Sequence, residues 1–188
     1  MGLKELQRAQ KSIKSVPIPC AHTANLCEVG VVSEQLNLAF VSSWEKEYSS
    51  RPAIAFVIWL MYTNGLRISE ILSITGRDIS RSYNIRIRSK KGSIDRLVNA
   101  SLFASFLESY IGNNTLVLGQ FDRFYIYREL KKLGLSYKFE GNQKSSVTHL
   151  GRHLFALENI PLADDNMSVG KMLGHKNENN QKYYVKEK

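Results

Sequence analysis

Residues 52–76 read PAIAFVIWLMYTNGLRISEILSITG, and this stretch decides the fold of the chain. It opens with a proline, which suits the first turn of a helix, and continues through an almost uninterrupted apolar segment to an Asn-Gly pair that ends helices. A helix that is apolar on all sides is buried. We therefore predict a core helix over residues 53–63, followed by a second helix over residues 68–75 that Gly76 ends.

The pattern changes in the following stretch, where residues 83–98 read YNIRIRSKKGSIDRLV. Tyr83, Ile85 and Ile87 alternate with polar or basic residues, which is typical of a half-exposed strand with a basic outer face. The KKGS segment is turn-like, and residues 96–98 return as a second strand. The stretch predicts a basic β-hairpin.

The other segments with a clear period are helical. Ser33 is the predicted N-cap of a helix whose apolar face includes Trp44. Further helices are predicted over residues 101–110, 122–133, 146–159, 168–173 and 179–184. The expected fold class is mainly α with a small antiparallel β-sheet, an α+β domain.

The predicted domain organisation is one globular domain with a short extension. Residues 1–32 form the extension, with a short helix over residues 3–13 and an irregular linker over residues 15–30 that contains both prolines of the region. Residues 33–188 form the domain, and 43% hydrophobic content over 188 residues is enough for one core.

Composition favours a polyanionic partner. The net charge of +9 and the pI near 9.6 favour nucleic acid before membrane. No apolar run is long enough to span a bilayer, and the N-terminus has no secretory h-region. Cys20 and Cys27 are too few for a disulfide framework and lack zinc-ligand spacing, so we expect reduced thiols and a cytoplasmic protein.

The first motif with a chemical reading centres on Arg67. It follows a glycine turn at the start of a predicted helix, where free backbone N–H groups and a guanidinium fork can bind a phosphate. Glu70 lies three residues on, on the same helical face. In isolation, the pair also fits an ordinary surface ion pair.

The second motif is the basic hairpin. Lys91, at its tip, can reach a neighbouring groove, and its ammonium can protonate a leaving alkoxide if its pKa is lowered. A solubilising turn lysine is the ordinary alternative. The other basic hairpin residues are predicted to contact DNA: Arg86, Arg88, Lys90 and Arg96.

The third motif is the sequence THLGRH, in which His149 and Arg152 lie one helical turn apart and project together. His149 and His153 have the i,i+4 spacing of a metal pair, but no third ligand follows at suitable spacing and no HExxH pattern exists, so no metal is expected. A histidine satisfied in the core is the alternative interpretation.

The fourth motif is Leu-Gly-His175, with Tyr184 nine residues later in a basic tail. Packing of the Tyr183-Tyr184 pair against the core is the ordinary alternative for these aromatic residues.

Each motif is weak alone, but their order and spacing together resemble the tyrosine recombinase (phage integrase) family over residues 33–186. The resemblance implies a catalytic set, with Glu70 in support and Tyr184, rather than Tyr183, as nucleophile. The implied catalytic residues are Arg67, Lys91, His149, Arg152, His175 and Tyr184.

What the resemblance implies is a site-specific recombinase or integrase that cleaves and rejoins DNA through a 3′-phosphotyrosyl intermediate, without metal or cofactor. Its partner is double-stranded DNA, on which it assembles as a tetramer, in the nucleoid or as the product of a virus or mobile element. The alternatives are a DNA-binding or regulatory relative with impaired catalysis, and an enzyme resembling a type IB topoisomerase or telomere resolvase.

The sequence departs from the family pattern at several points. Gly151 replaces a larger apolar residue, and glycine inside a helix costs about 1 kcal/mol relative to alanine, so it marks either a close backbone approach or a weakened site. The family's N-terminal helical domain and its helix beyond the tyrosine have no counterpart here, as expected of a minimal or a truncated recombinase. We expect weak, salt-sensitive DNA binding as a result.

Overall fold

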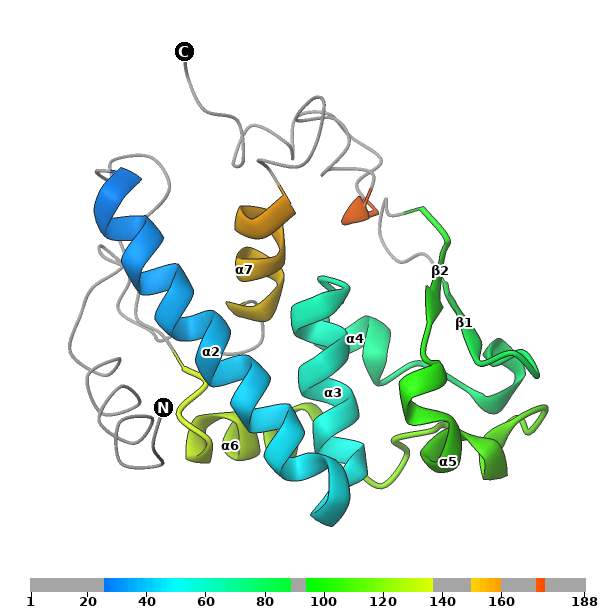
Figure 1. The fold of residues 1–188 in the computed structure, drawn as a ribbon. Helices are drawn as coiled ribbons and strands as arrows, with labels where there is room; N and C mark the ends of the chain where they lie inside the picture. Colours follow the sequence, from blue (N-terminus) through cyan, green and yellow to red (C-terminus); the bar gives the residue numbers. More distant parts are fainter. Residues whose placement is uncertain (1–25, 89–93, 137–149, 160–171, 175–188) are drawn as a thin grey trace.

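The structure is a computed structural model that describes residues 26–88, 94–136, 150–159 and 172–174 (Figure 1). Within these ranges it is mainly helical, and its sheet consists of two antiparallel strands. The predicted fold class is confirmed. The predicted helices over residues 3–13 and 179–184 and the hairpin turn lie outside the described residues, as does most of the helix predicted over residues 168–173.

The predicted core helix is α3 (Pro52–Thr63), and it begins at the proline and ends before Asn64 as expected. Eight of its residues are buried, including Phe56 and Tyr62. It packs against α2 (Leu26–Ser50), α6 (Arg123–Lys132) and α7 (Leu150–Asn159), so it is surrounded on most sides (Figure 1). This central position explains its nearly continuous apolar sequence.

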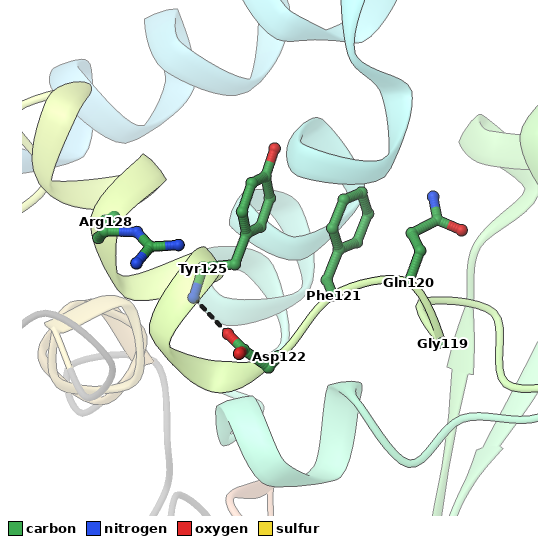
Figure 2. Close-up of a pocket in the computed structure, with 6 residues that line it drawn as sticks. All are labelled: Gly119, Gln120, Phe121, Asp122, Tyr125 and Arg128. Atoms are coloured by element: carbon green, nitrogen blue, oxygen red, sulfur yellow. Dashed lines mark hydrogen bonds between the residues drawn. The ribbon is translucent and has the colours of Figure 1, made fainter.

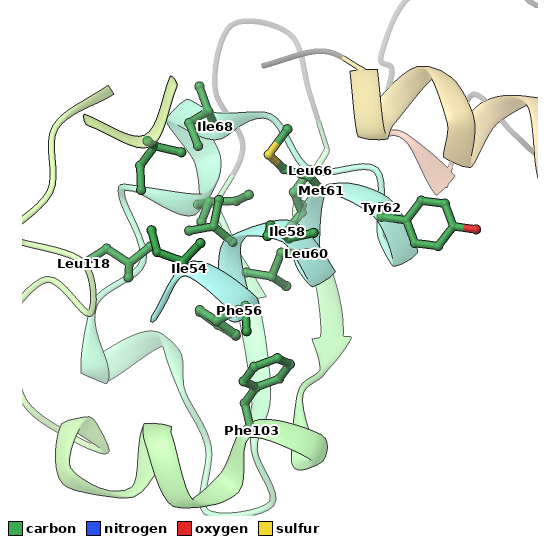
Figure 3. Close-up of a cluster of buried hydrophobic side chains, with 14 of the residues drawn as sticks. Ile54, Phe56, Ile58, Leu60, Met61, Tyr62, Leu66, Ile68, Phe103 and Leu118 are labelled. Carbon is green, nitrogen blue, oxygen red and sulfur yellow. The ribbon is translucent and has the colours of Figure 1, made fainter. Parts of the chain in front are cut away.

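The core around α3 extends to the segment that follows the hairpin. The ring of Phe56 meets that of Phe103 edge to face, with 5.2 Å between centroids (Figure 3). Phe103 itself is fully buried and belongs to a short 3₁₀ helix, Ser101–Phe103, directly after the second strand. The apolar contact therefore fixes the hairpin beside the core helix.

The predicted hairpin is present. Strand β1 (Asn84–Ile87) pairs with β2 (Arg96–Asn99), and Ile85 lies opposite Val98 on the buried face. Arg86 lies opposite Leu97 on the exposed face. The predicted alternation of apolar and basic residues is confirmed.

The helix after Arg67 is shorter than predicted. Helix α4 spans Ile68–Ile71, and Gly76 starts a 3₁₀ turn instead of ending a longer helix. The carboxylate of Asp78 accepts hydrogen bonds from both the amide and the hydroxyl of Thr75, which caps that turn. A Cβ on Gly76 would lie 1.7 Å from the carbonyl oxygen of Tyr110, so glycine is required there by close packing.

The start of α2 was also predicted wrongly. The helix begins at Leu26 and runs through Ser33, so Ser33 is not an N-cap and the linker predicted over residues 15–30 is wrong from residue 26 onward. Its single glycine, Gly30, costs about 1 kcal/mol in a helix, a penalty that tertiary packing readily overcomes. The domain boundary after residue 32 stays a prediction.

The helix predicted over residues 122–133 is confirmed as α6, with its two outer residues as caps. Asp122 is the N-cap, and its side chain accepts a 2.6 Å hydrogen bond from the amide of Tyr125. The residues predicted as a helix over 101–110 form one turn of α-helix, α5 (Ala104–Leu107), between two 3₁₀ turns.

Candidate active site

The structure describes six of the eleven residues predicted for the site. Five lie outside the described residues: Lys90, Lys91, His149, His175 and Tyr184. The six described residues are Arg67, Glu70, Arg86, Arg88, Arg96 and Arg152.

Arg67 occupies the N-cap position of α4, and Glu70 holds it there. The Arg67 amide donates to Glu70 Oε2 at 2.8 Å, and Arg67 Nη1 donates to Oε1 at 3.1 Å. The Glu70 side chain is 2% exposed, whereas that of Arg67 is 32% exposed. This is not an ordinary surface ion pair, because a buried carboxylate fixes an arginine that still has access to solvent.

Glu70 also binds a second arginine. Arg96 Nη2 donates to Glu70 Oε2 at 3.0 Å, so one buried carboxylate lies between two guanidinium groups. Burial lowers the pKa of Arg96, the charge of Glu70 opposes this effect, and the charge of Arg67 adds to it. An arginine remains charged through such a shift, so the three groups form a fixed cluster with a net positive charge.

Arg152, on α7, reaches the turn that precedes Arg67. Its Nη1 donates to the carbonyl of Gly65 at 2.7 Å, and its Nη2 donates to the carbonyl of Leu173 at 2.8 Å. The residue is 4% exposed. Arg152 therefore holds the glycine turn on one side while Glu70 holds Arg67 on the other.

The segment 172–174 closes these contacts into a ring. Arg96 Nη1 donates to the carbonyl of Met172 at 2.7 Å, next to the Leu173 carbonyl that Arg152 binds. In Figure 1 this segment lies between α7 and β2. We refer to Arg67, Glu70, Arg96 and Arg152, with the backbone of Gly65 and residues 172–174, as the arginine ring.

Two glycines let the elements of the ring approach one another. A Cβ on Gly151 would lie 2.9 Å from three atoms of Met61, so α7 contacts the backbone of α3 closely. The close backbone approach considered for Gly151 is thereby confirmed. Gly65 has a φ of +59°, and a Cβ there would lie 2.7 Å from Phe155 and 2.8 Å from Leu173.

The buried tyrosine Tyr62 was not singled out by the sequence. Its hydroxyl donates to Glu158 Oε1 at 2.7 Å, joining the ends of α3 and α7. Burial, followed by the hydrogen bond and charge of Glu158, raises the pKa of Tyr62 above its ordinary value. The only sequence signal was its position at the end of the core helix, so we regard Tyr62 as a structural residue.

The outer arginines of the hairpin differ from Arg96. The side chain of Arg86 is 66% exposed and pairs with Asp95 at 2.7 Å, and that of Arg88 is 61% exposed and pairs with Asp78 at 2.6 Å. Leu97, opposite Arg86, is 73% exposed. This face of the hairpin is basic and open to solvent.

A separate hollow lies where α6 begins (Figure 2). Phe121 and Tyr125 stack there with 4.8 Å between ring centroids, and Asp122 and Arg128 also line it. None of the site residues predicted from the sequence lines this hollow, and we assign it no catalytic role.

Two general features of the described ranges bear on function. No helix within them has the length and apolar character needed to cross a membrane. Their His, Cys, Asp and Glu side chains form no group of three or more that would hold a metal ion. The predicted histidines His149 and His175 lie outside these ranges.

Comparison with known proteins identifies the family. The sequence model described as "Phage integrase family" matches residues 43–188. The tyrosine recombinase XerA of Saccharolobus solfataricus is 32% identical over 124 residues, which are 64% of this chain and 41% of that protein.

Two solved structures are similar in fold. A crystal structure of XerA recombinase matches with a TM-score of 0.60 and 24% identity, over 80% of this chain and 58% of that one. The XerH site-specific recombinase bound to its difH substrate matches with a TM-score of 0.52 and 19% identity, over 98% of this chain and 49% of that one. The chain spans about two fifths of the length of its curated relative XerA. Because the family's sequence model covers most of the chain, the protein belongs to the phage integrase family of tyrosine recombinases.

Proposed function

We propose that this protein is a site-specific DNA recombinase that cleaves and rejoins DNA through a 3′-phosphotyrosyl intermediate. The observation that carries the proposal is the arginine ring. Arg67 and Arg152 come from distant parts of the chain. Arg67 ends the turn of residues 65–67 and donates to Glu70, and Arg152 donates to the Gly65 carbonyl of the same turn. Two guanidinium groups held in this way fit the charge of one phosphodiester.

The ring provides a preorganised electrostatic site. Cleavage of a phosphodiester passes through a pentavalent phosphorus with extra negative charge on its non-bridging oxygens. Fixed cations stabilise that charge without reorganising, and removal of one such donor commonly costs about 3–4 kcal/mol. Arg67 and Arg152 are the residues we assign to this role, with Glu70 as the group that positions Arg67.

The remaining roles fall on residues next to the ring in sequence. His149 directly precedes the first described residue of α7, and His175 directly follows Gly174. Lys91 lies between the two strands of the hairpin that contains Arg96. Chain connectivity therefore keeps these three residues within a few positions of anchored backbone, which supports a common site.

In the proposed reaction, the phenolic oxygen of Tyr184 attacks phosphorus and the bond from phosphorus to the 5′-oxygen breaks. His149 accepts the phenolic proton, because a free tyrosine has a pKa near 10 and is protonated at neutral pH. Lys91 protonates the leaving 5′-oxygen, and His175 donates a hydrogen bond to the phosphate. The covalent link conserves the bond energy, so a second 5′-hydroxyl can reverse the step without ATP.

The proposed partner is double-stranded DNA, on which the protein acts as a tetramer. The net charge of +9 and the exposed arginines of the hairpin support DNA binding, and the similar XerH structure is that of a recombinase bound to its difH substrate. A cytoplasmic, nucleoid-associated or mobile-element protein would meet this partner.

A trapping experiment tests the reaction. The full chain is incubated with a pool of nicked duplexes of randomised sequence, and protein–DNA bands that survive denaturant are isolated and sequenced. We expect covalent bands that Tyr184→Phe abolishes, that Tyr183→Phe retains, and that EDTA does not reduce. Bands retained in Tyr184→Phe and lost in Tyr183→Phe would reassign the nucleophile.

The same assay separates the alternative functions. Wild-type protein that binds duplex DNA and yields no covalent band is a DNA-binding relative without catalysis. Covalent bands with relaxation of supercoiled DNA and no strand exchange identify an enzyme of the topoisomerase type. Either result would refute the recombinase proposal.

A further inference from the structure

Arg96 differs in its surroundings from the other described arginines of the hairpin. Its side chain is 14% exposed, whereas those of Arg86 and Arg88 are 66% and 61% exposed. Both of its terminal nitrogens are used inside the protein, one by the carbonyl of Met172 and one by Glu70. The guanidinium of Arg96 therefore makes two internal hydrogen bonds, as that of Arg152 does, although the sequence predicted that Arg96 contacts DNA.

These contacts join three separate parts of the ring. Arg96 is the first residue of β2, so it belongs to the paired hairpin. Glu70 belongs to the helix that presents Arg67, and Met172 belongs to the segment that Arg152 binds. Within the part of the chain that the structure describes, Arg96 is the side chain that connects all three.

A backbone contact beside Arg96 reinforces this connection. The amide of Ile94 donates to the carbonyl of Gly174 at 3.0 Å. Gly174 has a φ of +71°, and a Cβ there would lie 3.2 Å from Arg96 Nη1 and 3.3 Å from the Ile94 carbonyl oxygen. The hairpin and segment 172–174 are thus in close contact at Gly174, where a side chain would be crowded and its backbone conformation strained.

We infer that Arg96 is a positioning residue for the proposed DNA cleavage, holding the Arg67–Glu70 pair, the hairpin and segment 172–174 at a fixed spacing. The inference rests on the proposed function for its catalytic meaning. The planar guanidinium of arginine can donate to a carboxylate and to a carbonyl in two directions at once, whereas a lysine ammonium is a point charge on a flexible side chain. Without the guanidinium, the spacing of the reacting groups is no longer fixed, and a misplacement of 1 Å costs about 100-fold in rate.

The test compares Arg96→Gln and Arg96→Lys with Arg86→Gln, a matched change on the open face of the same hairpin. The substrate is a duplex recovered from the covalent bands described above. For each variant we measure the dissociation constant, its salt dependence and the single-turnover rate of covalent attachment at saturating DNA.

The positioning role predicts a defect in rate and not in binding. For Arg96→Gln the saturating rate falls by about 100-fold while the dissociation constant changes by less than about threefold. Arg96→Lys, which keeps a cation beside Glu70, recovers part of this rate. Arg86→Gln instead weakens binding and reduces the salt slope by about one. An Arg96→Gln variant that binds weakly and cleaves normally at saturation is a DNA-contact variant, and this result would overturn the inference.

A second measurement does not depend on cleavage. Hydrogen exchange at the amide of Ile94 reports the contact with Gly174, and the amide of Ile58 in α3 reports the core. We expect exchange at Ile94 to be at least about tenfold faster in Arg96→Gln, with no change at Ile58. If Arg96→Gln unfolds and both amides exchange faster, the same comparison is made in Arg96→Lys.

The two measurements separate the two proposals. Wild-type protein that never forms a covalent band refutes the proposed function, while the exchange data still decide whether Arg96 anchors the hairpin. Unchanged exchange at Ile94 in a folded Arg96 variant refutes the inference and leaves the proposed function standing.

Discussion

Two sets of arginines in the described part of this protein have opposite surroundings. In the arginine ring, Arg152 is 4% exposed and the Arg96 side chain is 14% exposed, and both donate to backbone carbonyls. On the outer face of the hairpin, Arg86 and Arg88 each pair with one carboxylate and remain more than half exposed. The same side chain is therefore used inside the protein as a fixed charge and outside as an accessible one.

The difference follows from the cost of removing a charge from water. A buried guanidinium is tolerated only when its N–H groups are satisfied, and those bonds fix its geometry. An exposed guanidinium stays largely hydrated, so its desolvation cost is small. It can replace its carboxylate partner with a DNA phosphate. Under the proposed function, Arg67 and Arg152 of the ring would stabilise the transition state, and the outer face would attract DNA. Substitutions in the two regions test this division, from the largest expected effect to the smallest.

The largest effect is expected for Arg152→Gln. The change removes both donors and leaves the carbonyls of Gly65 and Leu173 buried without them. Each buried unsatisfied group costs about 1–3 kcal/mol, so the free energy of unfolding should fall by about 2–6 kcal/mol, and covalent attachment to DNA should be lost. Urea denaturation followed by the fluorescence of Trp44 and Trp59 measures the first effect. Arg152→Lys, which can satisfy one carbonyl, should recover part of the stability.

A loss of less than about 1 kcal/mol in Arg152→Gln would contradict this account, because it would mean that the carbonyls find other donors or water. The ring would then be a weaker constraint on the site than its burial indicates.

The second prediction concerns the close approach that places Arg152. Gly151→Ala raises helix propensity by about 1 kcal/mol, but its Cβ would lie 2.9 Å from the backbone and Cβ of Met61. Because backbone atoms cannot give way as a side-chain tip can, we expect a net loss of about 1–2 kcal/mol of unfolding free energy. Thermal and urea denaturation show whether Gly151→Ala raises or lowers the free energy of unfolding. A stabilised Gly151→Ala protein would show that α7 can move away from α3 without cost.

The elements with a strong sequence period could be predicted from the sequence. The apolar run of α3 and the alternation of Ile85 and Ile87 with arginines depend on local pattern, and both were confirmed. The contact between Arg67 and Glu70 could also be expected, since residues three apart on a helix are neighbours.

The ring itself could not be predicted from the residues. Arg96 and Arg152 bind the carbonyls of Met172 and Leu173, and a backbone carbonyl has no signature in the sequence. The errors at the end of α4 and at the start of α2 have a similar origin. Gly76 looks like a helix stop but is required by the nearby Tyr110 carbonyl, and α2 extends before Ser33. Only tertiary packing distinguishes these cases.

The third prediction concerns the stability that Asp78 contributes and its loss at low pH. Burial alone would raise the pKa of Asp78, but hydrogen bonds from Thr75 and the bond and charge of Arg88 outweigh it and lower the pKa below its ordinary value. A carboxylate with a lowered pKa stabilises the fold above its unfolded pKa of about 4, and this contribution is lost as the pH falls through the folded pKa.

The check is Asp78→Asn against wild type, by urea denaturation at several pH values. At neutral pH the variant should be less stable by about 1–2 kcal/mol, because a charged acceptor of Thr75 is lost. The difference should shrink as the pH falls below about 4. A difference that stays constant from neutral pH into that acid range would mean that Asp78 does not titrate with folding.

The smallest effect on stability, and the clearest contrast with Arg152, is expected for Arg88→Gln. Because the Arg88 side chain is 61% exposed, loss of its pair with Asp78 should cost no more than about 1 kcal/mol. Its effect should appear on DNA instead, where one fewer phosphate contact lowers the slope of log affinity against log salt by about one. The measurement is a salt titration of binding to duplex DNA beside urea denaturation of the free protein. If Arg88→Gln destabilised the fold as much as Arg152→Gln and left the salt slope unchanged, exposure would not separate the two groups of arginines, and the hairpin face would have to be counted as part of the structural ring.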